Sequence, residues 1–186
     1  MKKMFIAVSL LLISLTALAQ QQCLHSMALS APNTRFDYSK QGIVTDKLTG
    51  LTWMRCAVGQ HWDANLDRCL GEATLENWQS ALQTAQAVDD PHANHPLYQF
   101  AGKQAWRMPN IKELVSLTEM ACYSPSMNDR VWGSAYDVEP GDLAGYIWSN
   151  TPSTQEASAL SFDSVNGEVI HHSHNFAFSI LMVTDQ

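Results

Sequence analysis

Four cysteines, Cys23, Cys56, Cys69 and Cys122, are spread over this chain of 186 residues. A zinc site needs ligand pairs two to four residues apart, and a redox dithiol is normally C-x-x-C; the spacing here fits neither. Four cysteines allow three disulfide connectivities. We predict a local bridge between Cys56 and Cys69, across a segment rich in turn-forming residues, which leaves Cys23 to pair with Cys122.

The first 19 residues have the pattern of a secretory signal peptide. Lys2 and Lys3 precede an apolar run over residues 5–15, and Ala17-Leu18-Ala19 matches the small-x-small pattern of a cleavage site. We therefore expect a chain exported to the periplasm or the medium, with no membrane insertion after cleavage. Residues 20–40 are expected to form an irregular lead-in, and residues 41–186 a single domain.

The charge balance is strongly acidic. Without Lys2 and Lys3, nine Lys and Arg face eighteen Asp and Glu, a formal net charge of −9. A polyanion such as nucleic acid is a poor partner for such a surface. We expect a monomer that binds no nucleic acid and carries no cofactor.

Apolar periodicity and turn residues predict the elements of an α+β domain. The pattern predicts a β-hairpin over residues 42–54 and a helix over 74–88 with Thr74 as N-cap. It predicts a second helix that starts at Asn110 with a capping box to Glu113 and ends near Cys122. Strands are expected over residues 146–149, 159–162 and 168–172, with a tight turn at Asn166-Gly167, and a central strand over 176–183. Residues 123–145 are expected to be a long functional loop.

Several of these segments carry a recognisable pattern. TGLTW (residues 49–53), WRMPNIKEL (106–114) and YIWSNTP (146–152) closely resemble the DUF1566 or Lcl C-terminal domain family. That family reads T-G-L-x-W, W-R-L-P-N-x-K-E-L and Y-W-S-S-T in the same order, and the resemblance covers residues 40–184. It implies a C-type-lectin-like fold, with two helices packed on a twisted antiparallel sheet and a long loop region.

The resemblance also suggests a function. The family's named member is the sugar-binding tail of a bacterial collagen-like adhesin, which binds sulfated glycans, and no catalytic residues are established for the family. The present chain lacks a collagen-like Gly-x-x stalk, and its acidic charge disfavours a sulfated ligand.

Six tryptophans are the main aromatic candidates for a sugar-stacking surface. Trp53, Trp78, Trp106 and Trp148 lie on expected strands and helix faces, so we assign them to the core. Trp62 and Trp132 lie in expected loops and are better placed for an exposed contact. The ligand-binding candidates are therefore His61, Trp62, Trp132 and Tyr136.

Two segments contain possible metal ligands. Asp137, Glu139 and Asp142 gather carboxylates in the long loop, where lectin-like folds often hold calcium. His172 and His174 would share one face of a strand, and His92 or His95 would have to supply a third ligand in space. A solvated loop and a solvated strand edge explain both patterns without a metal, so no metal site is predicted.

These observations favour an exported, non-enzymatic binding module that recognises a glycan or protein ligand in the manner of an adhesin. A periplasmic inhibitor or immunity-type protein that binds another protein is the alternative. A hydrolase on a lectin-like fold is a weaker one, because the sequence has no nucleophile-elbow glycines and, with both disulfides formed, no free cysteine.

Overall fold

The predicted hairpin forms the centre of a four-stranded antiparallel sheet in the computed structural model, which describes residues 21–185. Its strands β3 (Ile43–Asp46) and β4 (Thr52–Met54) lie between β2 (Phe36–Tyr38) and the C-terminal β11 (Val183–Thr184). The predicted signal peptide lies outside the described residues. The lead-in is less irregular than expected, because β2 belongs to this sheet.

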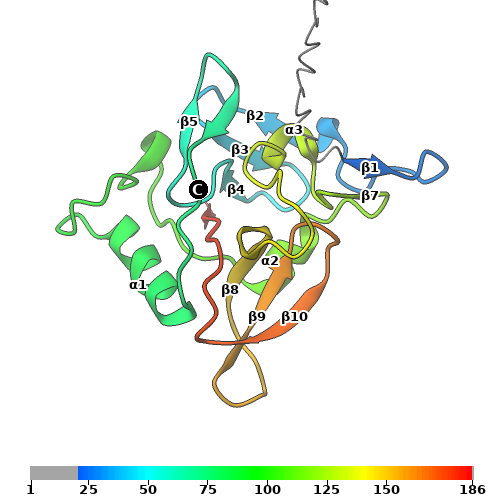
Figure 1. Ribbon diagram of the computed structural model, residues 1–186. Coiled ribbons are helices and arrows are strands. Elements are labelled where there is room, and N and C mark those ends of the chain that lie inside the picture. Colours follow the sequence, from blue (N-terminus) through cyan, green and yellow to red (C-terminus); the bar gives the residue numbers. More distant parts are fainter. Residues whose placement is uncertain (1–20, 186) are drawn as a thin grey trace, which may run out of the picture.

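A second sheet of three antiparallel strands is built from residues near the C-terminus (Figure 1). Its order is β10 (Val169–Ser173), β9 (Ser158–Asp163) and β8 (Tyr146–Pro152). The predicted turn at Asn166-Gly167 joins β9 to β10, with Gly167 at φ +82° and its N–H donating to the Asp163 carbonyl. The three strands predicted for this region are confirmed.

Two short antiparallel pairs contain three of the four bridged cysteines, Cys23, Cys69 and Cys122. β1 (Gln22–Cys23) pairs with β7 (Cys122–Tyr123), and β5 (His61–Asp63) pairs with β6 (Arg68–Leu70). The bridges join Cys23 to Cys122 and Cys56 to Cys69, as predicted.

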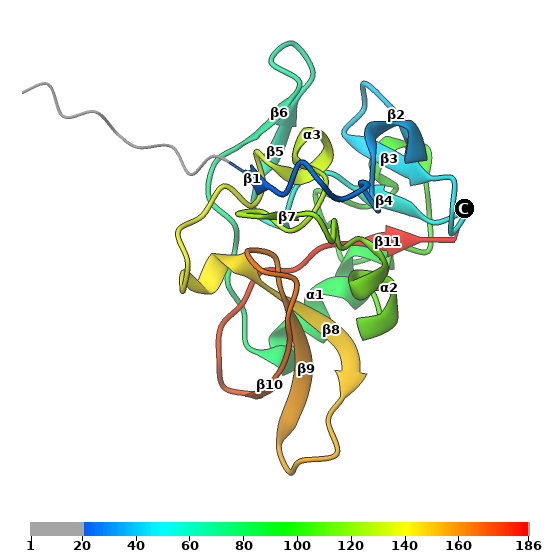
Figure 2. The ribbon, with the colours of Figure 1, turned by 90° about the vertical axis from the view of Figure 1, so that its right-hand side faces the viewer.

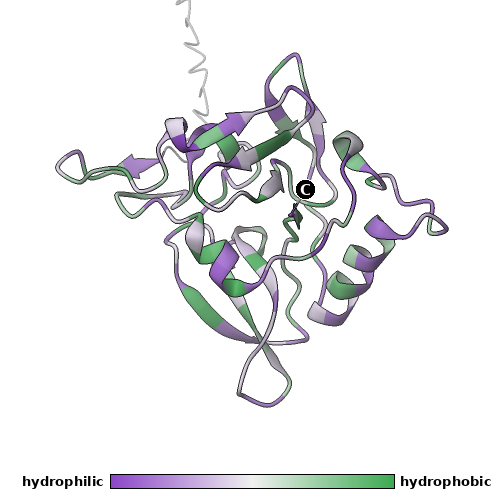
Figure 3. Ribbon diagram, turned by 180° about the vertical axis from the view of Figure 1, so that it is seen from behind, coloured by the Kyte–Doolittle hydropathy of each residue, from purple (hydrophilic) through white to green (hydrophobic). Residues whose placement is uncertain are grey.

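The helices are few and short. They are α1 (Trp78–Asp89), α2 (Ile111–Ser116) and α3 (Asp129–Trp132), with 3₁₀ turns η1 (Asn33–Arg35), η2 (Phe100–Gly102) and η3 (Leu143–Gly145). Hydrophobic and hydrophilic bands alternate along α1 (Figure 3), and its buried face carries Ala81, Ala85 and Val88. Its N-cap is Asn77 rather than Thr74, since the Asn77 side chain accepts from the Ser80 N–H. None of the described helices is long and apolar enough to cross a membrane.

The second helix begins as predicted and ends early. The capping box is present, with the Asn110 side chain accepting from the Glu113 N–H and the Glu113 carboxylate accepting from the Asn110 N–H. The helix stops at Ser116, not near Cys122, because the buried Glu119 carboxylate accepts hydrogen bonds from the N–H groups of Ser30, Ala31 and Ala121. These contacts turn the chain away from the helix axis and fasten the lead-in to the domain.

The apolar run near the C-terminus is buried on both sides, as expected, but it is not one strand. Phe178, Ile180 and Met182 pack into one hydrophobic cluster, whereas Leu181 and Val183 pack into the other. Figure 2 shows this segment, in red, running between the two larger sheets. Its backbone hydrogen bonds go to several separate segments, with partners that include Glu76, Val58, Met54 and Arg107. Regular strand pairing is therefore confined to its end, in β11. The structure is thus a mixture of helices and several small antiparallel sheets.

Candidate functional site

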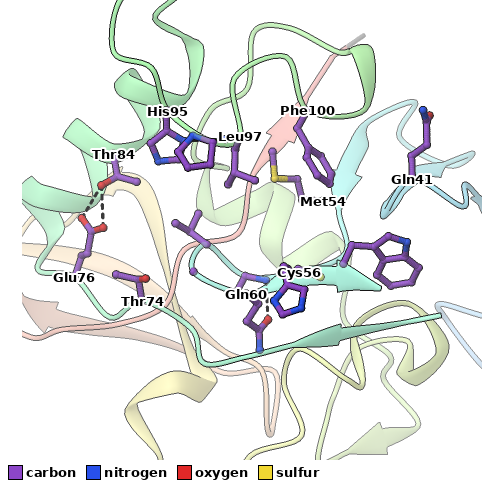
Figure 4. Close-up of a pocket in the computed structure, with 16 residues that line it drawn as sticks. Gln41, Met54, Cys56, Gln60, Thr74, Glu76, Thr84, His95, Leu97 and Phe100 are labelled. Carbon is purple, nitrogen blue, oxygen red and sulfur yellow. Dashed lines mark hydrogen bonds between the residues drawn. The ribbon is translucent and has the colours of Figure 1, made fainter. Parts of the chain in front are cut away.

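A cleft of about 630 Å³ lies between the loop closed by the Cys56–Cys69 bridge and the segment of residues 95–100 (Figure 4). Its volume is in the range of pockets that hold small ligands. Its lining comes from the hairpin, the disulfide loop, the chain leading into α1, α1 itself and residues 95–100: Gln41, Met54, Cys56, Ala57, Val58, Gly59, Gln60, His61, Trp62, Thr74, Glu76, Thr84, His95, Pro96, Leu97 and Phe100.

The disulfide loop is held in place by more than its bridge. Asp63 shapes the tip, since its Oδ1 accepts from the N–H groups of Asn65 and Leu66 at 2.8 and 3.0 Å. At the other end the Cys69 N–H donates to Ser134 Oγ at 2.9 Å. The wall that this loop contributes to the cleft is therefore fixed to the body of the domain.

Trp62 lines the cleft, as the sequence suggested, but it is half-buried and its ring is not a free stacking face. The Arg55 guanidinium lies 4.0 Å from the ring centroid, and the indole N–H donates to the Lys40 carbonyl at 2.8 Å. Gly42 lies so close that a Cβ there would come within 2.5 Å of Trp62 Cγ. One face of the ring and its N–H are therefore already engaged.

Arg55 is the residue that sequence reasoning missed. It is buried, and its guanidinium donates to the carbonyls of Val131 and Arg130 and to Asp67 Oδ1, at 3.2, 2.7 and 2.8 Å. The Arg55 side chain therefore links the end of the hairpin, the disulfide loop and α3. Its only signal in the sequence was its position next to Cys56, which does not reveal contacts to residues 75 positions away.

The opposite part of the cleft carries a carboxylate. Glu76 Oε1 and Oε2 lie 2.9 and 2.8 Å from Thr84 Oγ1, on the cleft side of α1. Its backbone is fixed by reciprocal hydrogen bonds with Phe178 and by the Trp148 indole N–H, which donates to the Glu76 carbonyl at 2.8 Å. The neighbouring surface is apolar, formed by Met54, Val58, Leu97 and Phe100 among others.

Two imidazoles complete the polar part of the lining. His61 is exposed on β5, as expected for a residue of the disulfide loop. His95 is half-buried, and its Nδ1 accepts from the Leu97 N–H at 3.2 Å. His61 and Trp62 are the predicted ligand-binding residues that the cleft brings together.

Trp132 and Tyr136 do not belong to this site, and the expectation that they are available to a ligand is wrong. Trp132 is 0% exposed, packs against Phe36 and Trp53, and its indole N–H donates to the Met54 carbonyl. Tyr136 is 1% exposed, and burial raises the pKa of its hydroxyl. Within residues 123–145, α3 packs into the core, because this removes more apolar side-chain surface from water than an exposed loop would.

The remaining tryptophans follow the core assignment. Trp53, Trp106 and Trp148 are at most 2% exposed. Trp78 is half-buried; its indole N–H donates to the Ser149 carbonyl, and its ring stacks on His174 with centroids 4.4 Å apart.

The possible metal ligands do not converge. In the described part of the chain, no three His, Cys, Asp or Glu residues form a group that could hold a metal ion. Asp137, Glu139 and Asp142 are exposed, and Asp142 caps η3 through the Ala144 N–H.

The histidines of the C-terminal run are engaged separately. His172 Nδ1 lies 2.8 Å from Ser161 Oγ, its ring packs against Tyr146 and Phe178, and burial lowers its pKa. His174 stacks on Trp78 instead, as described above. His92 is exposed and lies outside the cleft lining, whereas His95 is part of it.

Two serine–histidine contacts occur on the second sheet. Ser161 Oγ contacts His172, and Ser153 Oγ lies 2.7 Å from His171 Nδ1. Ser161 is 0% exposed, so its hydroxyl is not accessible to a substrate. Neither pair lines the cleft, and neither therefore marks it as a centre for acyl transfer.

Comparison with protein families gives one clear result. Residues 42–184 match the model of the Lcl C-terminal domain, which covers most of the chain. A search of curated proteins found no match.

Proposed function

The chain belongs to the Lcl C-terminal domain family, and on that premise we propose that it is an exported, non-enzymatic binding module that takes its ligand into the cleft. The observation that supports this most is the cleft itself, whose wall is fixed by the Cys56–Cys69 bridge and by Arg55. A preformed concave surface with an apolar floor and a few fixed polar groups is typical of ligand sites.

The finer parts of the proposal have their own support. The C-type-lectin-like fold rests on the family pattern, together with a β11 strand that returns to the sheet of β2 and β3. Export to the periplasm or the medium rests on two disulfides, which persist in oxidising compartments, and on the signal-like pattern of the first 19 residues. We propose that the module acts as a monomer and needs no cofactor.

The test is ligand screening with a variant that fills the cleft. Glycans and small-molecule fragments are screened by thermal shift, with and without calcium, against the wild type, Thr74→Trp and Leu75→Trp. Thr74 lines the cleft, whereas the adjacent Leu75 does not, so the two variants add the same ring on and off the site. Ligands should stabilise the wild type and Leu75→Trp but not Thr74→Trp. Binding that survives Thr74→Trp, or the absence of any ligand, would contradict the proposal.

A specific observation keeps the protein-binding alternative in view. Exposed apolar side chains lie on the two segments that the Cys23–Cys122 bridge joins: Leu24 (61% exposed), Met27 (45%), Leu29 (53%), Met120 (70%) and Tyr123 (56%). Side chains of this kind are common at protein interfaces. A stoichiometric protein partner recovered from periplasmic extract by the wild type and Thr74→Trp, but lost in Leu24→Ser/Met120→Ser, would favour this function.

A further inference from the structure

The charge of the cleft is one-sided. Glu76 is the sole acidic residue among those that line it, and the same described residues include no Lys or Arg. Arg55, which lies against the Trp62 ring, is buried and paired with Asp67 at 2.8 Å. We propose that the cleft selects a small ligand with an apolar body and a single amino group in its ammonium form, held by Glu76. This inference deepens the proposed function and rests on it.

Glu76 is held in position by several hydrogen bonds before any ligand binds. Its N–H donates to the Phe178 carbonyl at 2.9 Å, and its own carbonyl accepts from Phe178 at 3.0 Å and from Trp148 at 2.8 Å. Thr84 Oγ1 then holds the carboxylate from α1. A charged group that is ordered before binding loses little conformational entropy when a ligand arrives.

The Glu76 carboxylate has hydrogen-bonding capacity that Thr84 does not use. Both Glu76 oxygens lie within reach of Thr84 Oγ1, but a hydroxyl has one proton to donate. An ionised carboxylate can accept about four hydrogen bonds, so the one proton of Thr84 uses only part of the capacity of Glu76, which lines the cleft. An ammonium group, with three donors and no acceptor, complements it.

Part of the cleft lining that surrounds Glu76 is apolar. Met54, Val58, Leu97 and Phe100 form the apolar part of the lining and suit a hydrocarbon or aromatic body. Away from bulk water, an ion pair with Glu76 is stronger, and an anion there would be repelled. A neutral sugar would gain less, because one face of the Trp62 ring is already covered by Arg55.

Three probes of the same shape test the proposal: 2-phenylethylamine, 2-phenylethanol and phenylacetate. Their dissociation constants are measured by ligand-observed NMR at pH 8, where the amine of 2-phenylethylamine carries its charge. We expect the amine to bind more tightly than the alcohol, and the alcohol more tightly than the carboxylate.

Two variants separate the role of Glu76 from a change of net charge. Glu76→Gln should weaken the amine at least tenfold, equivalent to about 1.4 kcal/mol, while the alcohol binds as to the wild type. Glu72→Gln removes an exposed carboxylate of the same segment that does not line the cleft, and it should change neither ligand. Unchanged binding of the alcohol to Glu76→Gln also shows that the variant is folded.

Three results would overturn the inference: tighter binding of phenylacetate, equal amine affinity in the wild type and Glu76→Gln, or no binding of the amine at millimolar concentration. If one of these three results occurs while Thr74→Trp still abolishes the binding of another ligand, the proposed charge selectivity is wrong and the proposed function stands.

Discussion

Removing the two disulfides separately should destabilise the protein by different amounts, and only one of the two removals should weaken ligand binding. The Cys56–Cys69 bridge spans a sequence separation of 13, and the Cys23–Cys122 bridge one of 99. In the chain-entropy model, closing a loop of about 15 residues contributes about 3 kcal/mol, and one of about 100 residues about 4.7 kcal/mol. Cys23→Ala/Cys122→Ala should therefore lower the free energy of unfolding more than Cys56→Ala/Cys69→Ala.

The effect on the cleft should follow the opposite order. Cys56 lines the cleft, and its bridge fixes the wall that carries His61 and Trp62. The Cys23–Cys122 bridge joins β1 to β7, neither of which contributes to the cleft lining. Cys56→Ala/Cys69→Ala should thus weaken ligand binding measurably, whereas the other double variant, where folded, should bind as the wild type does.

Urea denaturation under non-reducing conditions, followed by tryptophan fluorescence, gives the free energy of unfolding and its slope with denaturant concentration. The slope with denaturant should rise in both double variants, because the unfolded chain expands when a cross-link is lost. A cost below about 1 kcal/mol for Cys56→Ala/Cys69→Ala, or a larger cost than for the other pair, would refute the entropic reasoning. Equal ligand binding in both variants would refute the role assigned to the bridge in shaping the cleft.

Three further perturbations have defined outcomes. Asp46→Asn should cost about 3 kcal/mol of unfolding free energy at neutral pH, because it leaves the buried Arg35 side chain unpaired. Burial alone would raise the pKa of Asp46, but hydrogen bonds, led by that from Arg35, lower it. The wild type should therefore lose this stability below about pH 4 in urea titrations, and the variant should not. Gly42→Ala should cost about 1–3 kcal/mol, because Gly42 has φ +80° and a Cβ would clash with Trp62, and near-UV circular dichroism should report the displaced indole. Trp132→Ala should cost about 3–5 kcal/mol in urea denaturation and leave ligand affinity unchanged, whereas a selective loss of affinity would return Trp132 to the ligand site.

The parts of the fold that the sequence predicted are those set by local chemistry. The capping box at Asn110 and Glu113 depends on residues three positions apart, and it is present. The turn at Asn166-Gly167 requires a positive φ that glycine supplies at little cost. The Cys56–Cys69 pairing followed in the same way from spacing and turn residues, and it left Cys23 to pair with Cys122.

The parts that were wrong depend on contacts between distant residues. α2 ends at Ser116 because Glu119 binds backbone groups of the lead-in, almost ninety residues away. Trp132 was expected in a loop, since residues 123–145 are rich in turn formers, but a four-residue helix places it against Phe36 and Trp53. Composition indicates that a segment is irregular and does not tell whether it is exposed.

The candidate site depends both on local sequence and on contacts between distant residues. His61 and Trp62, which lie between the bridged cysteines, were predicted from the sequence as ligand-binding residues, and both line the cleft. Glu76 and the segment 95–100 come from other parts of the chain, and only the fold brings them opposite that loop. The cover on Trp62 has the same origin, because Arg55 is held by carbonyls of residues 130 and 131.

The positions of the arginines add a reason to expect that this module does not bind polyanions. Arg35 is paired with Asp46, and Arg55 is paired with Asp67. Arg107 donates to Glu113 and to Asp185, and these hydrogen bonds, led by that to Glu113, raise its pKa. A guanidinium already engaged by a carboxylate has to break that contact, or share it, before it can bind a sulfate. Three of the five arginines in residues 21–185 are thus already engaged by carboxylates, in a chain that is acidic to begin with, and on our proposal ligand selection falls to Glu76, the carboxylate that lines the cleft.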